Sequence, residues 1–301
     1  MNWVSGITIT CFAASYTVSL VLEVSRLFFR AGSRMLVALG FAAAGLVAHS
    51  LYLVGEARNE IAGRGIPWSS WYDFCLLAAL VLAAAYWGLT VRRPDNALGI
   101  FLLPLVLALI GLALLFRDAA PFAPSAAIFT WRTIHGVTLL LGTVAVTLGF
   151  ATGVMYLVHS YRLKHKIPPR LGFRLPTLEW LQRFNRETLI ISTCLLAVGL
   201  ISGVVLNLGH HANAGTGVKW TDPVVLSSGV LFAWLLAIML FESFYRPARQ
   251  GKKVAYLTLA SFVFLGLALF FVLFGQHATQ ASRTPDAPAP LGSLVGQGGE
   301  R

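Results

Sequence analysis

Charged residues are scarce in this sequence, at 12% of 301 residues against about 25% in an ordinary soluble domain. With 57% hydrophobic residues and a positive mean hydropathy, this scarcity excludes a soluble domain and indicates that lipid surrounds most of the chain. Basic residues outnumber acidic ones by 23 to 12, a bias that can indicate nucleic-acid binding. Here they lie in short connections between apolar runs, so we expect membrane topology to explain them and no nucleic-acid partner.

Cysteines are also few, and none of the three belongs to a C-x-x-C pair. Cys11, Cys75 and Cys194 each fall within an apolar run, where a buried small hydrophobe is the usual role, so no thiol relay is expected. Acidic residues are missing from the middle of these runs, which argues against a proton relay. No internal repeat is visible, which disfavours a solute transporter.

Eight apolar runs approach or exceed the roughly 20 residues that a membrane-spanning helix needs. Prolines mark some of the breaks between runs, and Pro104 inside the fourth run is expected to be tolerated as a kink. The sequence therefore predicts an all-α, polytopic membrane helix bundle of about eight transmembrane helices, over residues 4–22, 35–54, 71–91, 97–116, 133–158, 187–207, 224–244 and 254–274.

Basic residues predict the orientation of these spans. Sixteen Lys and Arg residues fall in connections 26–34, 92–93, 162–186 and 246–253, and five fall in the other connections. The positive-inside rule then places both termini on the outer (periplasmic) side of a plasma (inner) membrane. The first run has no basic segment before it, so we expect it to remain as a helix and not to be a cleaved signal peptide.

The chain is expected to form one transmembrane domain over residues 1–277, followed by a tail. Residues 278–301 are rich in Ala, Pro and Gly, a composition typical of a disordered segment, here on the outer side. The longest inner connection covers residues 162–186, and its segment Leu175–Arg186 is predicted to form a short amphipathic helix on the inner surface.

Most histidines gather on the outer face in this topology. His49 is expected within two turns of the outer end of the second span, and His135 in the first turn of the fifth. His210 and His211 are expected in an outer loop, and His277 just beyond the eighth span. Because neutral imidazole is a good axial ligand for haem iron, this gathering predicts a haem site at the outer face.

Other outer residues suit a flat anionic ligand. The rings of Trp71 and Trp220 can lie against a planar cofactor, and the guanidinium groups of Arg64 and Arg132 match the geometry of haem propionates. Ordinary roles remain open for all of these residues. Tryptophans near span ends are typical of an interfacial belt, and a histidine pair in a Gly/Asn-rich loop is commonly solvated.

Five segments resemble the cytochrome c assembly protein family, in the same order along residues 35–277. They are Gly63–Asp73 before an apolar run, Trp131–Gly136, Leu175–Arg186 with the following Gly199–Gly203, Trp220–Pro223, and Phe232–Trp234. Two departures are present. Thr221 stands where the family has a second tryptophan before Asp222, and Leu240-Phe241 stands where a buried histidine usually ends the next span.

The resemblance implies site residues. His135 and His277, which flank the tryptophan loop, would be the two axial ligands of the haem iron, and His49 would be a membrane-embedded haem residue. Trp220 and Asp222 belong to the loop that contacts haem, and Trp71 and Arg132 join this set on the residue arguments above.

The resemblance also implies a function: an integral membrane protein that binds b-type haem transiently and supports cytochrome c biogenesis by delivering or attaching haem at the outer face. Its partners would be apocytochrome c or another assembly subunit, within membrane lipid. No catalytic side chain is predicted, so a component of a haem lyase or synthetase system is favoured over a stand-alone enzyme. The alternative is a haem X-like regulatory or scaffold protein that affects haem biosynthesis without attaching haem.

Overall fold

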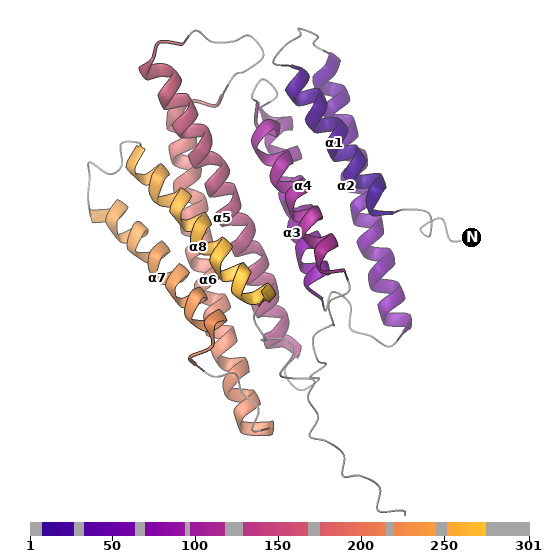
Figure 1. The fold of residues 1–301 in the computed structure, drawn as a ribbon, viewed down its shortest axis with the longest axis vertical. Helices are drawn as coiled ribbons and strands as arrows, with labels where there is room; N and C mark the ends of the chain where they lie inside the picture. The colour runs from indigo at the N-terminus through magenta and orange to yellow at the C-terminus, as the bar shows by residue number, and fades with distance from the viewer. Residues whose placement is uncertain are drawn as a thin grey trace, which may run out of the picture.

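The computed structural model describes residues 8–26, 33–63, 70–93, 97–117, 129–167, 175–214, 220–244 and 252–274. Within these ranges the regular structure is entirely helical, which confirms the all-α class (Figure 1). The helices are α1 (Ile9–Ser25), α2 (Ser33–Ala62), α3 (Trp71–Arg92), α4 (Gly99–Leu115), α5 (Phe129–Lys164), α6 (Leu178–Ala214), α7 (Pro223–Phe244) and α8 (Lys252–Phe274).

Five of the described helices are long and apolar enough to cross a membrane, namely α2, α3, α5, α6 and α7. The apolar parts of the other three, Ile9–Ser25, Gly99–Leu115 and Ala255–Phe271, are shorter. Large apolar side chains are exposed along several helices, including Leu36 and Val263, each 70% exposed. A helix that is apolar on its outward face as well as its packed face suits lipid surroundings.

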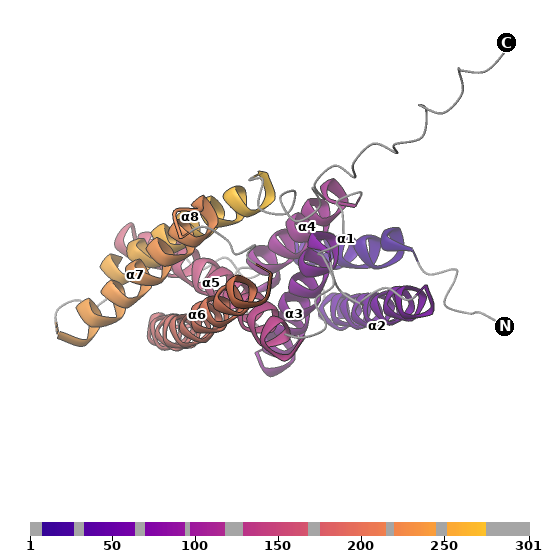
Figure 2. The same cartoon turned by 90° about the horizontal axis from the view of Figure 1, so that it is seen from below.

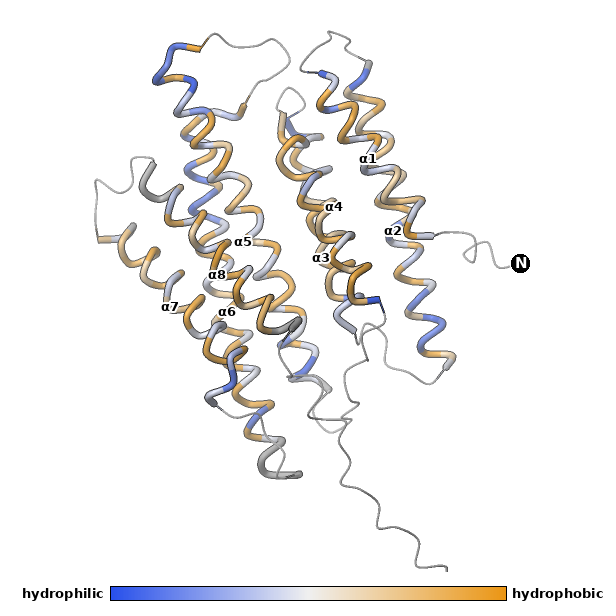
Figure 3. The backbone as a smooth tube through the Cα atoms, in the orientation of Figure 1, coloured by the Kyte–Doolittle hydropathy of each residue, from blue (hydrophilic) through white to orange (hydrophobic). Residues whose placement is uncertain are grey.

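Consecutive helices run antiparallel, so the connections alternate between the two ends of the bundle (Figure 1). We call the end with the α2–α3, α4–α5 and α6–α7 connections the His135 end, and the opposite end the basic end. α1 runs away from the His135 end and α8 runs toward it (Figure 1). Hydrophilic residues lie mostly toward the two ends, and hydrophobic residues dominate the middle of the helices (Figure 3).

The helices form two halves, α1–α4 and α5–α8, which meet where α5 packs against α3 and α4 (Figure 2). In the first half, Phe12, Tyr16 and Tyr86 are the largest fully buried side chains. A second core lies among α5, α6, α7 and α8, around Leu189 and Leu235. The antiparallel pair α5–α6 makes the most extensive contact in the bundle and carries the candidate site.

Two predictions about α6 were wrong. The helix ends at Ala214, so His210 and His211 lie in helical backbone and not in a loop. It begins at Leu178 and continues without a break, so Leu175–Arg186 does not form a separate surface helix. The physical reason is the same at both ends. Polar and charged residues interrupt an apolar run without interrupting the backbone hydrogen bonds of a helix.

Candidate functional site

His135 lies in the second turn of α5, at the His135 end, with its ring against α6. Its Nδ1 is 2.7 Å from the carbonyl oxygen of Gly199. A carbonyl oxygen only accepts hydrogen bonds, so Nδ1 is the donor and carries the proton. In the neutral ring Nε2 then holds the lone pair, which is the form of imidazole that ligates a metal.

Two glycines of α6 make room for this ring. A Cβ at Gly203 would lie 2.9 Å from Cε1 of His135, and one at Gly199 would lie 2.8 Å from Cδ2 of Leu139. The G-x-x-x-G segment Gly199–Gly203 therefore lets α6 approach α5 closely. Between the glycines, the buried hydroxyl of Ser202 donates to the Gly199 oxygen at 2.8 Å and lies 3.5 Å from Nδ1 of His135.

Trp131 and Arg132 precede His135 by four and three residues, so the helix period places them on the same side of α5. The Trp131 side chain is 42% exposed and that of Arg132 is half-buried. The structure therefore brings an imidazole, an indole and a guanidinium group together on α5 at the His135 end. Two of the three residues, His135 and Arg132, are among those for which the sequence predicts a haem role.

Trp71 opens α3 at the same end of the bundle. Ser70 and Asp73 cap this helix reciprocally: the Ser70 hydroxyl accepts from the Asp73 N–H, and the Ser70 N–H donates to the carboxylate of Asp73. The Trp71 ring is half-buried and lies edge-on to Phe74, with the ring centroids 5.8 Å apart. Its orientation is thus set by the start of α3.

Asp222 caps α7. Its Oδ1 accepts a hydrogen bond from the Val224 N–H at 2.8 Å, and Pro223 occupies the first helical position, where no N–H is needed. Trp220, two residues earlier, is 52% exposed. The Trp-Thr-Asp-Pro segment therefore ends in a helix start that holds Trp220 near the surface.

His49 occupies a different environment, in the middle of α2. Its side chain is fully buried, stacked flat on Phe12 at a centroid distance of 4.1 Å, with Nδ1 3.4 Å from the Tyr16 hydroxyl. Because α2 continues to Ala62, His49 is about 20 Å from the helix end at about 1.5 Å per residue, not within two turns of it.

The structure does not bring His49 and His135 together. Each histidine packs on a neighbouring helix of its own half, His49 on α1 and His135 on α6. Both views place α3 between α2 and α6 (Figures 1 and 2). His49 is therefore not part of the group formed by Trp131, Arg132 and His135.

Residues 68–278 match the family described as "Cytochrome C assembly protein". The chain belongs to the cytochrome c assembly protein family. The match runs from just before α3 to just beyond α8 and contains Trp71, His135 and Trp220. Helices α1 and α2, with His49, precede it. No curated protein and no solved structure matches the chain.

Family membership and the apolar helices together define the protein at a coarse level. It is a multi-pass membrane protein with a role in cytochrome c biogenesis. This confirms the resemblance drawn from the sequence, although the matched region begins at residue 68 and not at 35.

Some predicted residues of this cytochrome c assembly protein cannot be compared with the structure. His277 and Arg64 lie outside the described residues, and the side chains of His210 and His211 are likewise not described. Among the described residues, no three His, Cys, Asp or Glu side chains gather as they would to hold a metal ion. A haem iron needs only one or two axial protein ligands, so the haem prediction does not depend on such a cluster.

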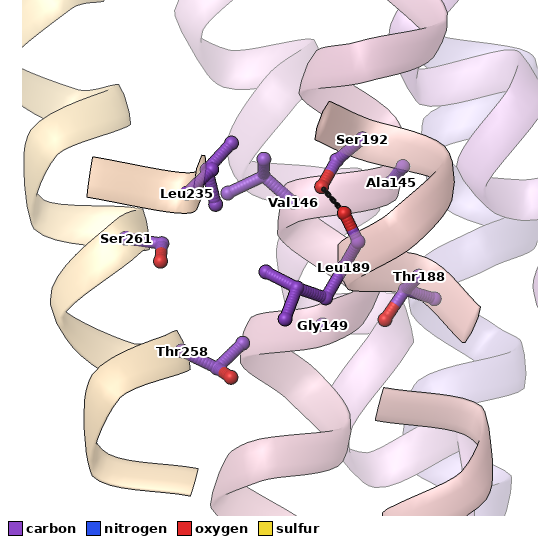
Figure 4. Close-up of a pocket in the computed structure, with 9 residues that line it drawn as sticks. All are labelled: Ala145, Val146, Gly149, Thr188, Leu189, Ser192, Leu235, Thr258 and Ser261. Carbon is purple, nitrogen blue, oxygen red and sulfur yellow. Dashed lines mark hydrogen bonds between the residues drawn. The ribbon is translucent and has the colours of Figure 1, made fainter. Parts of the chain in front are cut away.

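A small pocket lies in the interior of the second half, among α5, α6, α7 and α8 (Figure 4). Even with the space open to the surroundings included, its volume is about 170 Å³, below the roughly 300–1,000 Å³ of typical ligand pockets. The Ser192 and Ser261 hydroxyls beside it donate to the carbonyl oxygens of Leu189 and Leu257 of their own helices. None of the predicted haem residues lines this pocket, so it is not part of the candidate site.

Sequence reasoning missed Ser202 and the Gly199 carbonyl as partners of His135. In the sequence, the G-x-x-x-G segment Gly199–Gly203 by itself indicates only close helix packing. A serine three residues after the first glycine, on the same helix face, is the signal that a polar side chain from a neighbouring helix packs there.

Proposed function

We propose that this protein binds haem at the His135 end of the bundle and delivers or attaches it to apocytochrome c on the outer side of the plasma membrane. The observation that carries the proposal is the hydrogen bond from His135 Nδ1 to the Gly199 carbonyl. It leaves Nε2 as the unprotonated nitrogen. The basic residues are in excess at the opposite end of the bundle, so the positive-inside rule assigns this end of α5 to the outer side.

The residues at this end fit haem. His135 would supply one axial ligand, Arg132 would pair with a propionate, and Trp71 and Trp220 would lie against the macrocycle. His277 is the second axial ligand that the resemblance predicts. Bound haem would supply an iron that accepts imidazole and vinyl groups that cysteine thiols of an apocytochrome attack.

The chain's own contribution would be to bind and orient. No acid–base side chain is needed in this account, because holding the two reactants in register is itself a large effect. Ligation should be exchangeable, since haem must leave with the cytochrome. Asp222 would act indirectly, by fixing the start of α7 and thereby the position of Trp220.

The direct experiment is the visible absorption of the detergent-purified protein. We expect a haem band that is strongly weakened by His135→Ala. His165→Ala is the matched control, because His165 lies at the basic end, against the Tyr161 ring, and its loss should leave the band unchanged. An unaltered band in the His135→Ala variant would exclude His135 as a ligand.

One observation favours a second function. Thr221 stands where the family's loop has a tryptophan, which would reduce the contact of this loop with haem. A haem X-like regulatory or scaffold role, without haem attachment, is compatible with that change. A deletion strain separates the two functions: loss of holo-cytochromes c indicates assembly, and normal cytochromes c with altered haem-precursor levels indicate regulation.

A further inference from the structure

We propose that Ser202 and Gly203 of α6 are positioning residues that set the orientation and the donor strength of the His135 imidazole. This inference rests on the haem ligation by His135 proposed above. It concerns side chains that would not touch haem themselves and act through His135.

The Gly199 carbonyl oxygen is shared by two donors. It accepts from Nδ1 of His135 at 2.7 Å and from the Ser202 hydroxyl at 2.8 Å. Because both donors draw on the same oxygen, the serine limits how strongly the carbonyl polarises the Nδ1–H bond. When the nitrogen of a ligating histidine that does not bind the metal donates a hydrogen bond, the nitrogen that binds the metal becomes more basic.

Removing the Ser202 hydroxyl should therefore strengthen the bond between His135 and Gly199. A more basic imidazole favours ferric over ferrous iron, so the reduction potential of bound haem should fall in Ser202→Ala. Ser202 is almost fully buried, so bulk water does not readily replace its hydroxyl.

Gly203 acts on the same ring by its size. A Cβ at this position would lie 2.9 Å from Cε1 and 3.2 Å from Nδ1 of His135, so the ring must move when alanine is introduced. Nδ1 donates to the carbonyl oxygen of Gly199, which lies on α6 like Gly203. Movement of the ring away from Gly203 therefore lengthens or bends that hydrogen bond. Gly203→Ala should weaken the ligand and raise the reduction potential, opposite to Ser202→Ala.

Two matched controls exist on the same helix pair. Ser192 of α6 is buried and donates to the carbonyl three residues earlier, as Ser202 does, but it lies far from His135 along the helix. Gly142 of α5 also faces α6, yet an added Cβ would meet Leu196 at 3.5 Å, an ordinary contact. Ser192→Ala and Gly142→Ala should leave the potential unchanged.

The first experiment uses the haem-free protein and does not depend on the proposed function. The ¹⁵N chemical shifts of His135 in detergent should show a neutral ring protonated at Nδ1. Gly203→Ala should shift the Nδ1 resonance, and Gly142→Ala should not. A ring protonated at Nε2, or a resonance unmoved by Gly203→Ala, would overturn the positioning of His135 by these residues.

The second experiment is a spectroelectrochemical titration of the haem-loaded variants. We expect a lower potential for Ser202→Ala, a higher one for Gly203→Ala, and a return toward the wild-type value for Ser202→Thr, which keeps the hydroxyl. If Gly203→Ala does not fold, the comparison of Ser202→Ala with Ser202→Thr tests the inference on its own. Equal potentials, or shifts of the same sign in Ser202→Ala and Gly203→Ala, would contradict the inference.

Haem ligation by His135 and the positioning of its ring are tested by different variants. If His135→Ala leaves the haem spectrum unchanged, the proposed ligand is wrong. If His135→Ala abolishes the spectrum while Ser202→Ala and Gly203→Ala match wild type in potential, the ligand assignment stands and only the positioning inference fails.

Discussion

His49 shows how one residue can look functional in a sequence and pack like a core residue. Its ring face is covered by Phe12, its Nδ1 meets the Tyr16 hydroxyl, and its buried Nε2 has no hydrogen-bond partner among the described residues. An unsatisfied buried polar group costs about 1–3 kcal/mol. The haem role of His49 stays a prediction, and its packing is compatible with a structural one.

A double substitution tests this structural role. His49→Phe combined with Tyr16→Phe removes both polar partners and keeps two flat rings against Phe12. We expect the double variant to unfold at the same or a higher temperature in detergent, because replacing both partners by apolar groups of similar shape is nearly neutral or stabilising.

His49→Ala provides the contrast, since truncation of a large buried ring leaves a cavity and should cost about 3–5 kcal/mol. A folded double variant that has lost its haem absorbance would instead show that the His49–Tyr16 pair holds the cofactor.

His135 was predictable as a residue, and its surroundings were not. Its place near the start of an apolar run was visible in the sequence. Its anchor is the carbonyl of Gly199, 64 residues later, and backbone groups carry no sequence signal of their own. Only the packing of α5 on α6 reveals which ring nitrogen is held.

At the scale of elements, the sequence predicted the existence and order of the helices better than their ends. The predicted spans 133–158 and 187–207 lie within α5 and α6, which extend to 129–164 and 178–214. Hydropathy reports where lipid begins and ends, whereas a helix continues until its hydrogen bonding is interrupted. Segments such as Leu178–Arg186 are charged, helical and continuous with the span.

The start of α7 gives a prediction for a single element. Asp222→Ala removes the cap on Val224 and should destabilise the protein by about 1 kcal/mol, measured as a lower unfolding temperature in detergent. Asp222→Asn should be close to wild type, because asparagine caps as well as aspartate.

The asparagine variant also separates the two roles of Asp222. If it keeps its stability and its haem band, capping accounts for the residue. Loss of the band from a stable Asp222→Asn protein would mean that the carboxylate itself contacts haem or a partner.

At the scale of the molecule, the antiparallel run of consecutive helices places the α2–α3, α4–α5 and α6–α7 connections at one end. The excess of Lys and Arg in the other connections predicts that the His135 end faces outward. Sequence alone predicted this alternation from hydropathy. It could not predict the division into two halves, which depends on how α5 packs on α3 and α4.

The orientation can be measured by thiol labelling in cells. In a background in which all three cysteines are replaced, Thr216→Cys should react with a membrane-impermeant maleimide added outside, and Arg249→Cys should react only after the cells are permeabilised. The reverse pattern would place the haem residues on the wrong side of the membrane for the proposed function.

The central claim is that His135 Nε2 ligates haem iron, and ligand rescue tests it most directly. The visible spectrum of His135→Gly, oxidised and reduced, should lack the wild-type haem bands and regain them when imidazole is added. A glycine variant whose spectrum already equals that of wild type, without imidazole, would contradict the account.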